Sequence, residues 1–192
     1  MREAPSPMPE ITSLDAAIEA DIWTWLKTFV TVKNDFYKRK FAPCPYALAA
    51  LLADQVDVKV HVKGDVRGFI RAKSEELRDT PALSTRVIAF PPRIQFQWGI
   101  SDYVEMLNAE LIADGVFLNT GVTKTMPSRH TGANGKDPYF IVVANRLEAV
   151  LDGARALART KFYENWPKDQ YELVVERRER MAKRYGKTPL EG

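Results

Sequence analysis

The chain has 192 residues, of which 45% are hydrophobic and 10% aromatic, so it can form one domain with a buried core. Its 28 Lys and Arg barely exceed its 25 Asp and Glu, and a net charge of +3 argues against general attraction to nucleic acid or membranes. The single cysteine excludes an internal disulfide and favours a reducing compartment. No stretch reaches the roughly 20 apolar residues of a membrane helix. We therefore expect a soluble, cytoplasmic protein.

The proline-rich start of the chain predicts a flexible tail over residues 1–12, followed by one globular domain over 13–192 that includes a C-terminal helix. Ser13 is a suitable N-cap, and apolar residues then recur at helical spacing as far as Val30. Asp65 is a suitable cap for a later helix. Further helices are expected at 47–54, 101–112 and 147–162 and from about Pro167 onward.

Two patterns predict strands. Valines alternate with charged residues over 56–62, which indicates a strand at or near a sheet edge, whereas 139–144 is apolar on both faces and indicates a central strand. Shorter apolar runs at 86–90 and 116–118 complete the set, and the first two strands with the intervening helix predict a parallel pair. The predicted class is α+β: a two-layer α/β sandwich with one mixed sheet of four or five strands and helices mostly on one face.

Cys44 stands between two prolines where a short apolar helix begins. Pro45 suits the first helical position, which leaves Cys44 at the cap, facing unpaired N–H groups and the positive end of the helix dipole. These neighbours favour thiolate, so a partly accessible Cys44 with a lowered pKa is a candidate nucleophile. The alternative is a small buried hydrophobe, which is the commoner role of an isolated cysteine.

The segment from Asn119 to Asp137 shows no periodicity and is longer than most structureless loops within a domain. It is rich in hydrogen-bond donors, and Arg129, His130 and Lys136 with nearby glycine N–H groups predict an anion-binding loop. His130 is the better acid or base of the two histidines, because a loop position leaves it reachable. The alternative is a solvated hairpin without function.

Several other patterns are weaker. A zinc site from Cys44, His61 and His130 lacks any short ligand spacing, so no metal is predicted, and no motif identifies a cofactor. Arginines and lysines crowd the last helix, but glutamates interleave with them, which is typical of a solvated face. These basic residues are Arg177, Arg178, Arg180, Lys183, Arg184 and Lys187.

Trp25-Leu26, followed by Pro43-Cys44-Pro45-Tyr46, resembles small uncharacterised bacterial families that have a Trp-Leu helix and a Cys-Pro-Phe motif. One such family also has a Pro-Tyr-Pro followed by an arginine, and here Asp137-Pro138-Tyr139 and Arg146 occupy comparable positions. The resemblance implies that Cys44, Pro138, Tyr139 and Arg146 are site candidates. It carries no established activity. Histidines of that family are replaced here by Val143 and Phe90.

These features lead to a small enzyme or ligand-binding protein for a small polar or anionic metabolite. Its pocket is expected between the Cys44 turn, the 119–137 loop and Arg146, at the end of a sheet. The alternative is a non-catalytic accessory protein that binds a protein partner, or a second copy of itself, through exposed aromatics and the C-terminal helix. The aromatics in question are Trp23, Trp98 and Trp166. Nucleic acid is disfavoured by the near-neutral charge.

Overall fold

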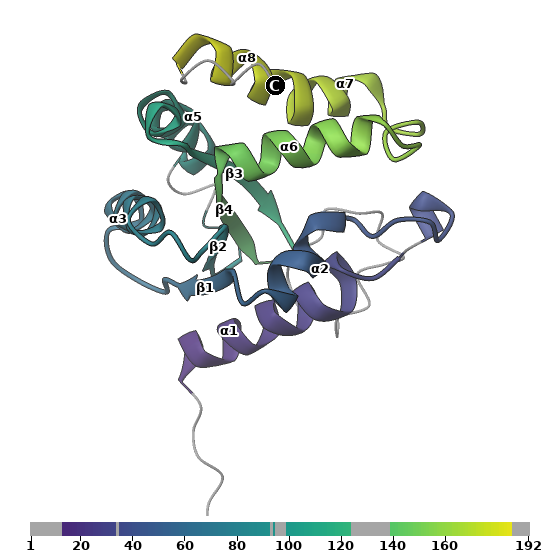
Figure 1. Cartoon of the computed structure of the whole chain (residues 1–192). Helices are drawn as coiled ribbons and strands as arrows, with labels where there is room; N and C mark the ends of the chain where they lie inside the picture. Colours follow the sequence, from purple (N-terminus) through teal and green to yellow (C-terminus); the bar gives the residue numbers. More distant parts are fainter. Residues whose placement is uncertain (1–12, 34, 93, 95–98, 124–138, 186–192) are drawn as a thin grey trace, which may run out of the picture.

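The computed structural model describes residues 13–33, 35–92, 94, 99–123 and 139–185. Four strands form one sheet, and helices surround it (Figure 1). The elements are α1 (Leu14–Trp25), η1 (Leu26–Val30), η2 (Asp35–Tyr37), α2 (Pro45–Leu52), β1 (Val56–Val60), α3 (Val66–Arg78), β2 (Thr85–Phe90), α5 (Ile100–Leu111), η3 (Ile112–Asp114), β3 (Val116–Val122), β4 (Phe140–Arg146), α6 (Leu147–Ala158), α7 (Lys168–Tyr171), η5 (Glu172–Glu176) and α8 (Arg177–Tyr185).

The sheet has the strand order β1-β2-β4-β3 and is mixed. β1 runs parallel to β2, with Val58 opposite Val87, while β4 runs antiparallel to both of its neighbours. The predicted parallel pair, the edge position of β1 and the interior position of β4 are confirmed. β3 is longer than expected: residues 119–122, assigned to a loop from the sequence, continue the strand because they pair with β4 as far as Val122 and Phe140.

One face of the sheet is covered by α3 and α5. Asp65 caps α3 as predicted, since its Oδ1 accepts a hydrogen bond from the Gly68 N–H at 3.0 Å. α5 begins one residue before the predicted cap Ser101, with Gly99 in the left-handed region at φ 54°. Both helices pack on the even-numbered residues of β2 and β4. The fully buried residues at this contact include Ile70, Leu77 and Leu107 of the helices and Ile88 and Val142 of the strands.

The opposite face is covered by α1 with η1, and by α2. Ile18, Ile22 and Leu26 lie at helical spacing and pack with Val87 and Ile141 of the sheet. The α+β class with one mixed sheet of four strands is confirmed. The structure differs from the expected two-layer arrangement in having helices on both faces. The reason is that the two central strands are apolar on both sides, and both sides must be shielded from water.

The C-terminal helices flank the β3 side of the sheet (Figure 1). Pro167 caps α7, close to the predicted start, and α7, η5 and α8 run on without a break. Val175 and Ala182 are buried on one stripe, and Ala182 packs with Phe117 of β3 and Leu147 of α6. None of the described helices combines the length and apolar character needed to cross a bilayer.

Candidate functional site

Cys44 is the N-cap of α2, as predicted, with φ −130° and ψ 93°. Its backbone N–H donates to the Val30 carbonyl at 3.1 Å, which ties the turn to the end of η1. Pro45 stands at the first helical positions, where its fixed φ and missing N–H cost nothing. The sequence thus places the thiol correctly at a helix N-terminus.

The thiol itself is not activated. Cys44 is partly exposed as a residue, but its side chain packs among the apolar residues that α1 and the sheet bury. Burial raises the pKa of the Cys44 thiol, and this effect outweighs hydrogen bonding from the backbone of Ala47 and Tyr46 and the positive charge of Arg178. The expectation of a lowered pKa is therefore wrong, because desolvation of the sulfur dominates over the helix terminus.

We expect the alkylation rate of Cys44 to stay low through neutral pH and to rise only above about pH 9, the region in which free cysteine is already ionised. The sign follows from the raised pKa: the protonated thiol is the form favoured by the fold. Iodoacetamide kinetics against pH measure this directly. Rapid reaction at pH 7 would instead show that the thiolate is stabilised.

Arg146 does not face the Cys44 turn. It projects to the α3 side of the sheet, and its guanidinium donates to backbone carbonyls at the end of α3 and in the turn that follows. The acceptors are Leu83 at 2.8 Å, Leu77 at 3.0 Å, Arg78 at 3.4 Å and Thr80 at 2.8 Å. Arg146 therefore links the end of β4 to α3 and to the turn after it through these hydrogen bonds. Its predicted place in one pocket with Cys44 is wrong, because the two residues lie on opposite faces of the sheet.

Tyr139 lies just before β4, at the other end of that strand from Arg146. Its hydroxyl donates to Asp21 of α1 at 2.6 Å, and burial, helped by this carboxylate, raises the pKa of Tyr139 to about 12. Tyr139 therefore joins α1 to the sheet. The other predicted loop residues, Arg129, His130 and Lys136, lie outside the described residues, as does Pro138, so their roles stay predictions.

Aromatic rings fill the space beside the Cys44 turn, where the segment after η1 meets the end of α6. Tyr37 and Phe162 stack at 4.6 Å between ring centroids, and the Trp166 indole N–H donates to the Tyr37 hydroxyl at 3.0 Å. The cluster consists of Tyr37, Phe41, Tyr46, Leu157, Phe162, Tyr163 and Trp166. Trp166, one of the aromatics proposed from the sequence to bind a partner, is thus engaged within the chain.

Arg178 is a buried cation that reaches this aromatic cluster from α8. Only 7% of the residue is exposed, and its Nε finds no hydrogen-bond acceptor in the described part of the chain. Arg177 and Arg180 pair with surface glutamates, whereas no ion pair to Arg178 occurs among the described residues. Burial lowers the pKa of Arg178, and the groups whose charges counter this effect are Tyr163, Glu179, Tyr46 and Cys44.

Tyr46 adds a second buried polar group to the same place. Its O–H finds no acceptor among the described residues, although the backbone N–H of Leu157 lies near enough to its oxygen to lower its pKa. Burial is the larger effect and raises the pKa of Tyr46 to about 12, so the phenol keeps its proton at neutral pH. The ring lies against Gly153 of α6: a Cβ at that position would come within 2.7 Å of it. Glycine is needed there because α2 and α6 approach closely.

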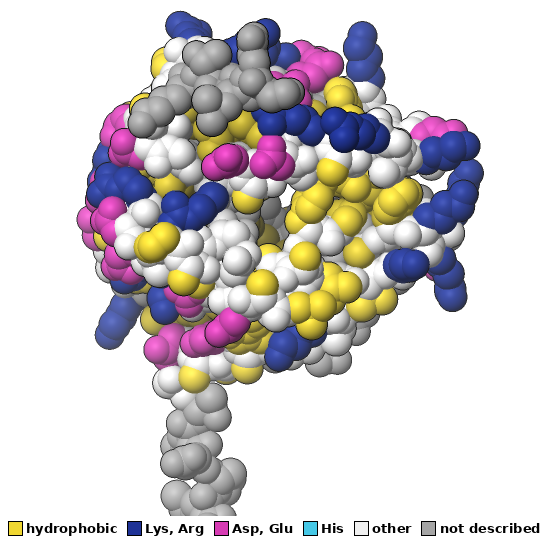
Figure 2. Space-filling view, viewed as in Figure 1, with side chains coloured by type: hydrophobic (Ala, Val, Ile, Leu, Met, Phe, Trp, Pro, Cys, Tyr) yellow, Lys and Arg dark blue, Asp and Glu magenta, His cyan; other side chains and the backbone are white. Residues whose placement is uncertain are grey.

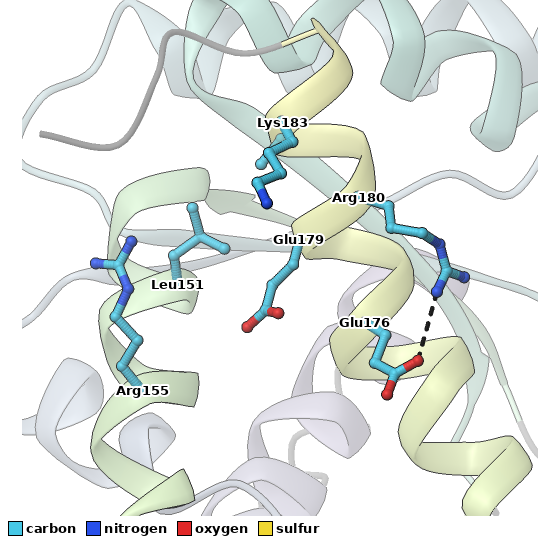
Figure 3. Close-up of a pocket in the computed structure, with 7 residues that line it drawn as sticks. Leu151, Arg155, Glu176, Glu179, Arg180 and Lys183 are labelled. Atoms are coloured by element: carbon cyan, nitrogen blue, oxygen red, sulfur yellow. Dashed lines mark hydrogen bonds and ion pairs between the residues drawn. The ribbon is translucent and has the colours of Figure 1, made fainter. Parts of the chain in front are cut away.

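A cleft of about 540 Å³ opens between α6 and the terminal helix (Figure 3). Arg155 projects from one wall, while Lys183 and Glu179 project from the other. Arg155 pairs with Asp152 at 2.7 Å, and Arg180 pairs with Glu176 at 3.5 Å. The cleft therefore carries charges of both signs, several of which are paired. Arg178 of α8 differs from these surface groups in being buried and in having no ion pair among the described residues.

We define the Arg178 site as Arg178, Tyr46, Tyr163 and Cys44. It combines a guanidinium, which always donates, with a phenol that stays protonated and a neutral thiol. Such a set offers donors to an anion, and the one carboxylate whose charge is seen to act on Arg178 is the exposed Glu179. Within the described residues, no cluster of His, Cys, Asp and Glu could hold a metal ion.

Comparison of the chain with protein-family models, with curated proteins and with solved structures finds no match. The resemblance to small bacterial families therefore stays a proposal. Sequence reasoning missed Arg178 because it lies in a run of basic and acidic residues that is typical of a solvated face. A signal was present: Val175, Arg178 and Ala182 share one helical stripe, and the apolar members of that stripe are buried.

Proposed function

We propose that the protein binds a small anionic molecule at the Arg178 site. The observation that supports this is an arginine that is only 7% exposed as a residue, whose Nε has no hydrogen-bond acceptor and which forms no ion pair among the described residues. Removing a charge from water costs several kcal/mol, and that cost must be offset by an opposite charge or by hydrogen bonds. A bound carboxylate or phosphate would supply both, since the guanidinium donates in a fixed fork geometry.

Two neighbouring groups support an anion in particular. The Tyr46 O–H, which finds no acceptor among the described residues, can donate to a second ligand oxygen. The rings of the aromatic cluster exclude water, which strengthens such bonds. Cys44 contributes a neutral thiol rather than a nucleophile, so the proposal is ligand binding and does not require covalent catalysis. The proposed compartment is the cytoplasm, which the single cysteine favours.

The experiment is a binding titration with inorganic phosphate, acetate and benzoate, monitored by calorimetry and by the thermal midpoint. We expect at least one of these anions to bind the wild type and to bind Arg178→Met about 10- to 100-fold more weakly, the range that one lost charged hydrogen bond produces. Tyr46→Phe should weaken the same anion less, because it removes a neutral donor.

Lys183→Met is the matched control, since it removes a cation from α8 that faces the surface cleft. Its affinity for the anion should equal that of the wild type. The proposal fails if none of the three anions binds, if Arg178→Met binds as tightly as the wild type, or if Lys183→Met loses as much affinity as Arg178→Met.

A further inference from the structure

The outward face of α2 is an apolar stripe with nothing on it in the described part of the chain. Leu48 is 47% exposed and Leu52 is 81% exposed, and they lie one turn apart. The opposite face of the helix packs on the core through Ala47, Ala50 and Leu51. A helix that is apolar all round is normally covered on all sides. The stripe, formed by Leu48, Ala49, Leu52 and Ala53, is therefore a candidate interface.

Exposed charges of opposite sign precede and follow α2 in the chain. Before α2 come the exposed Lys38, Arg39 and Lys40, and after it comes the exposed Asp54. Arg39 is already paired with Asp35 at 2.7 Å, which leaves the lysines as the net basic groups at that end. Figure 2 shows hydrophobic side chains gathered over the region of α2, with charged side chains around them.

We propose that a second copy of this chain covers the stripe, in a two-fold dimer with the α2 helices antiparallel. In that arrangement Leu48 of each protomer meets Leu52 of the other, and the basic end of one helix faces the acidic end of its partner. An isologous interface requires a surface that is complementary to itself, and a stripe with opposite charges at its ends satisfies this requirement. The inference is independent of the anion site.

The small size of the interface predicts a weak dimer. One eight-residue helix per protomer offers less surface than the 1,200–2,000 Å² typical of stable complexes. The dimer should therefore form reversibly and depend on protein concentration. Because the charged ends attract, it should also weaken as the salt concentration rises.

Sedimentation velocity over a range of protein concentrations tests the proposal. We expect a monomer–dimer equilibrium for the wild type, and a dissociation constant at least tenfold higher for Leu52→Glu and for Leu48→Glu. Leu173→Glu is the matched control, because Leu173 is 60% exposed on the terminal helix, and it should leave the equilibrium unchanged. Asp54→Asn should weaken the dimer at low salt only, and asparagine also tolerates the positive φ of 56° at that position.

All four variants alter exposed residues, so the thermal midpoint of the diluted monomer should stay near that of the wild type. A wild type that is monomeric at every concentration would overturn the proposal. So would a dimer that survives both leucine substitutions in α2, or one that is abolished by Leu173→Glu.

Discussion

Replacing Arg178 with methionine is expected to raise the stability of the ligand-free protein, by about 1 to 4 kcal/mol, the range seen when buried ion pairs are replaced by well-packed apolar side chains. Methionine keeps most of the aliphatic length of arginine and adapts to irregular space beside the aromatic cluster. The desolvation that lowers the pKa of Arg178 is the cost that this change removes. Urea denaturation without added anions measures the gain.

The control for this prediction is again Lys183→Met, which should change stability by no more than about 0.5 kcal/mol, as expected for a surface residue. A gain in stability combined with lost anion affinity would identify Arg178 as a residue kept for binding. A large loss of stability in Arg178→Met would show the opposite, namely that the chain itself supplies a partner for the guanidinium.

Removing residues 167–192 is expected to unfold the domain or to lower its stability by several kcal/mol. Without the terminal helix, the buried side chains of Ile112, Phe117 and Leu147 lose a covering element. Each large apolar side chain returned to water costs about 1.5 to 3 kcal/mol. The burial of Val175 against the rest of the chain adds to this loss. Circular dichroism during thermal unfolding of the shortened chain measures the effect.

Leu173→Ala is the control and should leave the midpoint close to that of the full chain, because Leu173 lies in the same terminal helix but is 60% exposed. If the deletion proved equally stable, the terminal helix would be a detachable arm. That result would favour the accessory-protein alternative, in which the helix docks on a partner.

Much of the fold could be predicted because its signals are local. Apolar and charged residues alternate in β1, which indicates that one face of this strand is exposed to solvent. The residues of β4 are largely apolar, which indicates that both faces of this strand are buried. A strand that is apolar on both sides, as β4 is, needs a covering layer on each face of the sheet. It therefore favours helices on both faces over the predicted two-layer arrangement. Element ends were less certain: β3 extends to Val122 because its partner strand continues, which is a long-range effect.

The site could be predicted only in part, because it depends on which side of the sheet each residue faces. Arg146 and Arg178 are equally basic in the sequence, yet one is satisfied by four carbonyls of α3 and its turn, and the other is buried among tyrosines. The pKa of Cys44 was mispredicted for a similar reason. The helix terminus is a local feature, whereas desolvation comes from residues that are distant in the sequence.

The contact between Tyr46 and Gly153 constrains how this protein can diverge. Any side chain at position 153 would collide with the Tyr46 ring and force α2 away from α6, so the two positions cannot change independently. In homologous chains, an aromatic residue at position 46 should be accompanied by glycine at position 153. A bulkier residue at position 153 should be accompanied by a smaller one at position 46. This covariation links residues more than 100 positions apart, and with an arginine at 178 it would mark distant relatives that keep the proposed anion site.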